Sequence, residues 1–342
     1  MQAPSTTRAD ITIATKVAFL RRPEAYPERP GHIDVVETHL SWVFLGPTHV
    51  YKLKKPVRHP FLDLTTLEAR RRNSEREVTL NRRLAPDVYL GAVPLVLAHD
   101  GCLILQGQGE AVEWLVRMKR LPAGRMLDAA IRSGTVAEED VRALVRRLAI
   151  FYRNAERIPT TVTAYRAGFA AGIEANRAEL IQPHYGLPAA SIERLAELQL
   201  RYLASEGEAL DERARNDRIV DAHGDLRPEH ICLGTEPKII DCLEFRRELR
   251  LLDPVDELAF LAMECERLGA AALGERILQG YLRASGDAPA PGLVGFYKAY
   301  RACLRARIAI WHIVDHEIRD TGKWRARAMD YLALAARHAE RW

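Results

Sequence analysis

Cysteine is scarce in this sequence, and its spacing fits neither a disulfide framework nor a structural zinc site. The 342 residues contain five cysteines, with no Cys-x-x-Cys pair. An odd number of cysteines cannot all pair with one another, and zinc sites usually draw on closely spaced cysteine pairs. We therefore expect reduced, buried thiols in a cytoplasmic protein.

Long apolar runs are also missing. No stretch approaches the roughly 20 apolar residues that a membrane-spanning helix needs. Residues 1–10 are polar and lack the apolar segment of a signal peptide. These two absences predict a chain without a membrane partner.

The sequence has little net charge of either sign, with 50 basic and 46 acidic residues and a net charge of +4. Its densest basic run, Arg70 to Arg72, falls within a predicted helix and is interpreted as a solvated face. Nucleic-acid-binding proteins usually gather basic residues on one face or arm, so we expect no nucleic-acid partner. A hydrophobic content of 48% is ordinary for a globular protein, and the length suits two lobes.

Hydrophobic periodicity predicts a β-rich part followed by a larger helical part. Alternating or compact apolar runs predict strands in residues 33–37, 42–45, 50–54, 91–98, 103–106 and 112–118. Residues 65–84 have the pattern of one charged amphipathic helix between these strands. From residue 128 the chain is mostly helical in pattern, ending with segments 294–316 and 323–342. This order predicts an α+β chain of two unequal lobes.

The most informative segment is His223-Gly224-Asp225-Leu226-Arg227-Pro228-Glu229-His230. It is followed by a predicted hairpin in residues 231–240 and then by Asp241. Phosphoryl transfer from ATP needs a carboxylate that orients the attacking hydroxyl and a metal ligand near the phosphates. An acid at the end of an apolar strand suits a hard cation such as Mg²⁺.

This segment resembles the protein-kinase catalytic loop H-R-D-L-K-P-E-N, in the H-G-D form of the aminoglycoside and choline phosphotransferases. The segments at 50–57 and 81–91 resemble an uncharacterised bacterial branch of aminoglycoside phosphotransferase-like proteins. The resemblance implies a bilobal protein-kinase-like fold, ATP with Mg²⁺ as cofactors, and Asp225 as the catalytic base. It also implies that Asp241 binds the metal and that Arg227 keeps a positive charge near the transferring phosphoryl group.

The resemblance divides the chain into three parts. Residues 1–30 form an N-terminal extension with a short helix. Residues 31–118 form a nucleotide-binding N-lobe, with a small antiparallel sheet and one helix. Residues 119–342 form a larger, mainly helical C-lobe that carries the catalytic loop and binds the acceptor.

His230 departs from the pattern, which has an asparagine at this position. An imidazole nitrogen binds softer metal ions better than it binds Mg²⁺. His230 is therefore interpreted either as a metal ligand that shifts preference toward Mn²⁺, as a hydrogen-bond partner of Asp225, or as a cap of the loop. A loop with weakened catalysis is a further alternative.

The first lobe supplies candidates for nucleotide binding. Val50-Tyr51-Lys52-Leu53 resembles the kinase strand whose lysine pairs with the ATP phosphates and with a helix glutamate. Lys52 is preferred over Lys54 on the same face of the strand, and Glu77 over Glu75 as its partner. No glycine-rich phosphate loop precedes this strand.

Two further positions are predicted from their place in the resemblance. Ser41 or Thr38 could contact phosphate in place of a glycine-rich loop, through a hydroxyl or a backbone amide. Met118 stands where the hinge would be, with a backbone that would pair with adenine. An equally plausible interpretation of Met118 is a plain linker.

The acceptor is predicted to be a small molecule with a hydroxyl, such as a sugar, an amino sugar or a similar metabolite. Arg301, Arg305, Arg307 and His312 crowd one helix, with Asp315 and Glu317 at its end. That pattern hints at a neutral or anionic acceptor, or else at a solvated helix face. Asp256, in a segment that resembles D-P-x-x-D-L-A, is interpreted as structural.

The sequence also bears on three rival functions. A protein kinase would need an activation segment, and residues 246–252 are too short and contain no serine, threonine or tyrosine. A catalytically weak or inactive nucleotide-binding regulator is consistent with His230 and with the missing glycine loop. A metal site of His230, Cys232 and Cys242 matches no common zinc spacing.

Overall fold

The computed structural model describes residues 11–59, 62–314, 321–340 and 342. The chain forms two compact units, and each is a separate body with its own core. The first consists of residues 1–123 together with 238–247, and the second of residues 124–237 and 248–342. Residues 238–247, which contain Asp241, therefore belong to the first unit, although the sequence placed them in the C-lobe.

The first unit is built on a six-stranded sheet in which every neighbouring pair of strands is antiparallel, in the order β1-β2-β3-β8-β6-β7. Its strands are β1 (Asp34–Glu37), β2 (Ser41–Leu45), β3 (His49–Lys54), β6 (Tyr89–Leu97), β7 (Leu103–Leu105) and β8 (Glu110–Lys119). β3 and β8 are central, so side chains on β3 are fixed by neighbours on both sides. The predicted strands agree with these to within a few residues.

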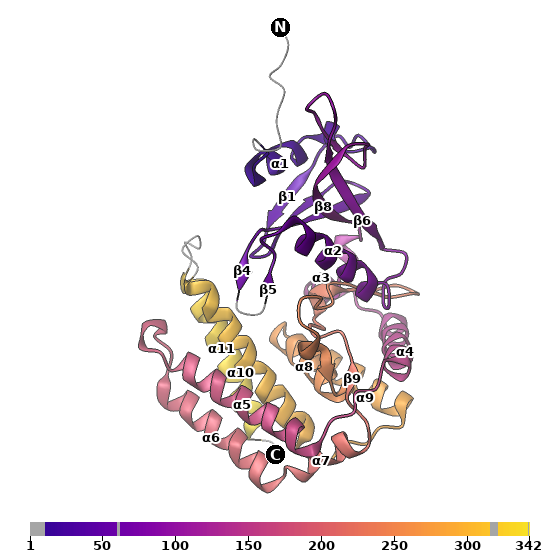
Figure 1. Ribbon diagram of the computed structural model, residues 1–342. Coiled ribbons are helices and arrows are strands. Elements are labelled where there is room, and N and C mark those ends of the chain that lie inside the picture. Colours follow the sequence, from indigo (N-terminus) through magenta and orange to yellow (C-terminus); the bar gives the residue numbers. More distant parts are fainter. Residues whose placement is uncertain (1–10, 60–61, 315–320, 341) are drawn as a thin grey trace. The chain divides into compact units, whose positions relative to one another are not determined.

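Helices and short strands complete the first unit. They are α1 (Ile13–Leu20), α2 (Leu67–Asn81), the strand pair β4 (Arg58–His59) and β5 (Leu62–Asp63), and β11 (Lys238–Ile239). α2 packs on β8 and β6 (Figure 1). Thr66 caps α2, because its side chain accepts a hydrogen bond from the N–H of Ala69. β4 and β5 follow Pro56, and the sequence did not predict them.

A buried carboxylate ties both helices of the first unit to the sheet. Glu113 on β8 has no exposed surface, and it accepts hydrogen bonds from Lys16 of α1 (2.9 Å) and from Arg70 of α2 (2.7 and 2.9 Å). A charge without solvent contact is stable only when it is paired in this way. Arg70, interpreted from the sequence as part of a solvated run, is therefore a buried ion-pair residue, whereas Arg71 and Arg72 are exposed.

The second unit is mainly helical. Its helices are α3 (Leu127–Ser133), α4 (Glu138–Asn154), α5 (Val162–Leu180), α6 (Ala189–Ser205), α7 (Glu208–Arg215), α8 (Pro254–Arg267), α9 (Ala271–Ser285), α10 (Leu293–Val314) and α11 (Thr321–Ala339). Its short strands are β9 (Val220–Asp221), β10 (Ile231–Cys232) and β12 (Leu251–Leu252). α10 and α11 pack along each other, and α8 is buried among its neighbours (Figure 1).

The loop after β9 is anchored by its flanking strands. β9 pairs with β12 in antiparallel fashion, and the buried Arg250 forms an ion pair with Asp221 of β9 at 2.9 Å. The N–H of Ala222 also donates to the carbonyl of Arg250. The segment that begins at His223 therefore starts from a fixed point. No helix within the described ranges is long and apolar enough to cross a membrane.

Candidate active site

Each unit contains one part of the predicted machinery. In the first unit, Lys52 on β3 donates a hydrogen bond to Glu77 of α2 at 3.0 Å and another to Asp241 at 2.8 Å. Lys52 is 25 positions before Glu77 and 189 before Asp241, so only the fold brings the three together. The three residues chosen from the sequence for phosphate and metal binding thus form one connected cluster.

Lys54 belongs to the same cluster and has a different set of contacts. It forms ion pairs with Glu77 and with Glu244, the latter at 2.5 Å. Its side chain is only 2% exposed, whereas that of Lys52 is 16% exposed. Lys52 is therefore the lysine that a ligand can reach, and Lys54 serves to fix the position of Glu77. The rival Glu75 is exposed and pairs with Arg71.

The cluster brings groups of opposite charge together. The carboxylates of Glu77, Asp241 and Glu244 form ion pairs with the ammonium groups of Lys52 and Lys54. Burial alone would lower the pKa of Lys52, but the carboxylates of Asp241 and Glu77 raise its pKa well above the ordinary value. The side chain of Asp241 is 46% exposed, so solvent can reach it.

The backbone at Asp241 is held in an uncommon conformation. Its φ is 62°, in the left-handed region that residues other than glycine rarely adopt. Two contacts hold the loop: the N–H of Asp241 donates to the hydroxyl of Tyr89, and the N–H of Cys242 donates to the side-chain oxygen of Asn81. Strain of this kind is often found at functional sites, because the surrounding structure must maintain it.

In the second unit, Asp225 lies within a set of basic groups. Arg227 donates to its carboxylate at 2.9 Å. Burial would raise the pKa of Asp225, but the positive charges of Arg227 and Arg305 lower it below the ordinary value. Asp225 is therefore ionised at neutral pH. Burial alone would lower the pKa of Arg227, but the carboxylates of Asp225 and Glu229 raise this pKa above the ordinary value.

His230 lies at the end of the short 3-10 helix η5 (Pro228–His230) and has both ring nitrogens engaged. Nδ1 is 2.9 Å from the backbone oxygen of Asp225, and Nε2 is 3.1 Å from Arg227. Because an arginine can only donate, Nε2 must accept, and Nδ1 carries the proton. These contacts favour the interpretation in which His230 supports the Asp225 loop, since the lone pair needed for a metal is already in use. Among the described residues, no group of three or more His, Cys, Asp or Glu side chains is placed to hold a metal ion.

A glutamate that the sequence motif does not include holds the loop that begins at His223. Glu257 of α8 accepts hydrogen bonds from the N–H groups of His223 (3.1 Å) and Gly224 (2.5 Å) and from the hydroxyl of Tyr152 (2.7 Å). Gly224 has a φ of 92°, which explains why glycine replaces the arginine of the kinase pattern at this position. Asp256 pairs with Arg301, as expected of a structural residue.

Glu257 gives a direct prediction. Replacing it with alanine would leave two buried N–H groups and a tyrosine hydroxyl without an acceptor, at roughly 1–3 kcal/mol for each group left unsatisfied. We expect Glu257→Ala to lower the urea midpoint of unfolding strongly. Tyr152→Phe removes only one hydrogen bond from the same carboxylate and is the matched control, with an expected loss of about 1 kcal/mol. Equal losses in the two variants would show that the backbone contacts contribute little.

Two residues that were predicted to contact the nucleotide lie within the sheet. Ser41 is fully buried in β2. Met118 is a core residue of β8 paired with Val50 on one side and Tyr89 on the other, so the sheet occupies its backbone. The amide groups of Lys119 and Arg120 are also bonded, to Val88 and Thr48.

The basic helix face is likewise mostly neutralised. Arg301 is buried against Asp256, and Arg305 bonds Glu264 at 3.1 Å. Arg307 lies over the ring of Trp311, and burial lowers its pKa. The helix is α10, and Asp315 and Glu317 lie outside the described residues. These pairings remove the argument for an anionic acceptor based on Arg301 and Arg305.

The fold matches solved structures of small-molecule kinases. The complex of APH(2'')-IIIa with GDP and kanamycin aligns with a TM-score of 0.57 and 14% identity, covering 95% of this chain and 98% of that one. A choline/ethanolamine kinase family protein from Mesorhizobium loti aligns with a TM-score of 0.52 and 14% identity, covering 96% and 98%. The likeness confirms the predicted protein-kinase-like fold.

Curated sequences give relatives but no activity. Uncharacterized proteins of Mycobacterium tuberculosis and Mycobacterium bovis are 37% identical to this chain over 279 residues, which is 81% of this chain. The chain spans about half the length of these relatives, 54%. No protein-family model matches the sequence.

Proposed function

We propose that this chain is an ATP-dependent phosphotransferase that transfers the γ-phosphate to a hydroxyl of a small molecule such as a sugar or an amino sugar. The observation that carries the proposal is the contact of Lys52 with both Glu77 and Asp241. A lysine held by a helix glutamate and beside a metal-binding aspartate is the arrangement that kinases use to hold ATP phosphates. The structural neighbours named above support the reaction class.

The residues of the first unit fit a nucleotide with a divalent cation. Asp241 would hold Mg²⁺, because its carboxylate is half exposed and lies beside the lysine that would hold the phosphates. When bound, Mg²⁺ would neutralise the negative charge that develops on the phosphate groups. Lys52 would hold the phosphates, with Glu77 and Lys54 fixing its position.

Asp225 would orient the acceptor hydroxyl and receive its proton. Its lowered pKa makes it a weak base at neutral pH, so positioning would contribute more than proton abstraction. This is compatible with phosphoryl transfer, whose loose transition state needs little help from a strong base. Arg227 adds positive charge beside the carboxylate and would stabilise charge on the phosphoryl group.

A catalytically weak nucleotide-binding regulator is the second candidate. Two ion pairs favour this candidate. Lys52 already forms an ion pair with Asp241, and Arg227 already forms one with Asp225. If these pairs persisted with nucleotide bound, neither carboxylate would be available for metal or acceptor. The two candidates differ in turnover and agree in nucleotide binding.

The test combines binding with an acceptor screen. Thermal shift with ATP or GTP, each with Mg²⁺ or Mn²⁺, measures nucleotide binding, and γ-labelled nucleotide with sugars, amino sugars, choline-like alcohols and nucleosides measures transfer. Transfer to one acceptor class supports the phosphotransferase. Binding without transfer or hydrolysis supports the regulator, and the absence of any shift contradicts both.

The charge of Arg227 predicts a change in pH dependence. Activity requires ionised Asp225, so the rate falls as pH drops through the pKa of that carboxylate. Arg227 lowers this pKa, and its removal leaves burial to raise it. In Arg227→Ala we expect the acid limb of the kcat profile to move to higher pH, whereas Arg227→Lys should retain most of the original position. If the acid limb does not move in Arg227→Ala, the ionisation of Asp225 is not what causes the fall in rate at low pH.

A further inference from the structure

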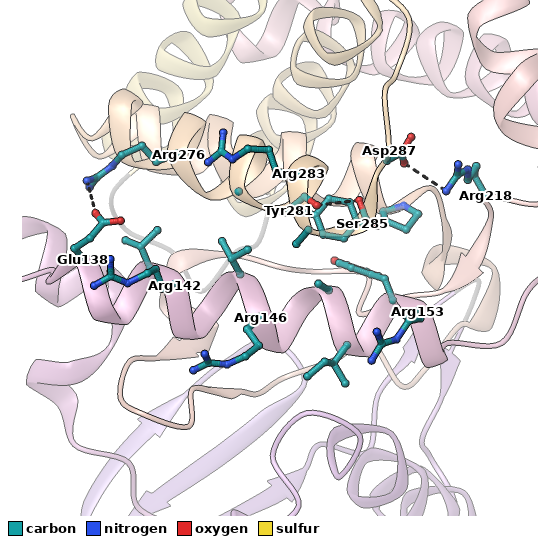
Figure 2. A pocket seen from close by; sticks show the side chains of 18 of the residues that line it. Glu138, Arg142, Arg146, Arg153, Arg218, Arg276, Tyr281, Arg283, Ser285 and Asp287 are labelled. Atoms are coloured by element: carbon teal, nitrogen blue, oxygen red, sulfur yellow. Dashed lines mark hydrogen bonds and ion pairs between the residues drawn. The ribbon is translucent and has the colours of Figure 1, made fainter.

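The second unit contains a cavity of about 620 Å³ that is dominated by arginine. Its wall residues come mainly from α4 and α9 (Figure 2). Seven arginines line it: Arg142, Arg146, Arg153, Arg157, Arg218, Arg276 and Arg283. Only two acidic residues, Glu138 and Asp287, share the lining. None of these residues belongs to the proposed catalytic machinery.

The acids of this region neutralise only part of the charge. Glu138 pairs with Arg276 at 2.9 Å, and the neighbouring Glu139 pairs with Arg142 at 2.6 Å. Asp287 is 3.9 Å from Arg218 but is held more closely by another arginine, the buried Arg213, at 2.6 Å. Each carboxylate near the cavity therefore already has an arginine as its ion-pair partner.

Three of the lining arginines remain without such a partner. Arg146 and Arg153 on α4 and Arg283 on α9 are exposed and have no hydrogen bond or ion pair with any residue that the structure describes. Figure 2 shows Arg146 and Arg153 on the α4 side and Arg283 on the α9 side of the cavity. Exposed guanidinium groups on two neighbouring helices give this region a positive potential that attracts anions.

The floor of the cavity explains why a hollow exists here. α4 and α9 approach closely at Gly280, where an added Cβ would lie 2.8 Å from the Cγ2 atom of Val145. Ala149 and Ala284 also contribute small side chains to the lining. A glycine inside a helix costs about 1 kcal/mol relative to alanine, so its presence is explained by this close packing. Small residues at the floor and long arginines around it make a concave basic site.

We propose that this cavity binds a small organic or inorganic anion that carries two or more phosphate groups. Guanidinium groups match phosphate oxygens in geometry and charge, and several of them on two helices can contact several phosphates at once. A volume of about 620 Å³ is in the range of small-ligand pockets. This size favours a small ligand over a nucleic acid or an acidic protein segment, which would need a longer basic surface.

Inorganic tripolyphosphate is the probe, measured by isothermal titration calorimetry on the whole 342-residue chain. We expect one site whose affinity falls as salt is raised. The double variant Arg146→Glu/Arg283→Glu should bind at least about 10-fold more weakly, because two charged contacts are lost and two repulsive charges are added. Arg201→Glu, which reverses an exposed arginine of α6 in the same unit, is the matched control and should bind like the parent chain.

A second comparison separates this site from the proposed nucleotide site. Lys52→Met should keep its tripolyphosphate binding, and the double variant should keep the thermal shift produced by nucleotide with Mg²⁺. Equal weakening by Arg201→Glu, loss of tripolyphosphate binding in Lys52→Met, or no binding in the parent chain would each overturn the proposal. The proposal would also be overturned if an acidic peptide or an oligonucleotide displaced tripolyphosphate at a concentration below that of tripolyphosphate. That result would indicate a macromolecular partner.

Discussion

Replacing Asp225 with asparagine is expected to lower kcat by about 10²- to 10⁴-fold, the range typical of a lost general base. Asparagine keeps the size of the side chain but cannot accept the proton of the acceptor hydroxyl. Nucleotide affinity should change little, because the residues assigned to phosphate and metal binding belong to the first unit. The expected result is therefore a loss of turnover with nucleotide binding retained.

The measurement pairs steady-state transfer with nucleotide titration in the same variant. Asp330→Asn makes the same chemical change at an exposed position of α11 and serves as the control. Thermal unfolding must also be compared, because Asp225→Asn removes the ion pair of Arg227 and leaves Glu229 at 3.5 Å as its remaining acidic partner. Transfer at the parent rate in a folded Asp225→Asn protein would remove Asp225 from the mechanism.

Local pattern was sufficient for most of the first unit. Alternating apolar residues predicted β2 and β3 closely, because each strand has one face in the core, and the periodicity of residues 65–84 predicted α2. The short pair β4 and β5 was missed, since two-residue strands beside prolines have no periodicity to detect. Residues 60–61, between them, lie outside the described ranges.

The site residues that belong to a sequence motif could be predicted. Those that are placed only by tertiary contacts were missed. Asp225 and Asp241 lie in a motif-like segment, and Lys52 follows a recognisable strand. Glu257 gave no such signal, because its role depends on Gly224, 33 positions away, and on Tyr152, 105 positions away. The sequence sign that could have drawn attention to Glu257 is an acid directly before the apolar run of residues 258–263.

Asp241 shows why the sequence could not assign it to a unit. The chain returns to the first unit only for residues 238–247, and the contacts that hold them there are spread over β3, α2 and β6. Tyr89 and Asn81, which fix the backbone of this loop, lie about 150 positions earlier. Only the folded chain reveals that the metal-ligand candidate and the lysine candidate share one compact body.

The two lysines of β3 allow a test of which one acts on ligand. Lys54→Met removes the positive partner of two buried carboxylates, those of Glu77 and Glu244. Breaking a buried ion pair from one side costs about 3–5 kcal/mol, because the remaining charge is left without compensation. We expect Lys54→Met to lower the free energy of unfolding by that amount, measured by urea denaturation.

Lys52→Met makes the same substitution two residues earlier with a different expected outcome. Glu77 retains Lys54, and Asp241 is half exposed, so the loss of stability should be much smaller. Transfer should nevertheless fall by about 10²-fold or more, since the phosphates lose their cation. If Lys54→Met loses stability and Lys52→Met loses turnover, Lys54 has a structural role and Lys52 binds the phosphates. The reverse pattern would mean that Lys54 leaves its carboxylates to bind the nucleotide, and that the contact of Lys52 with Asp241 is structural.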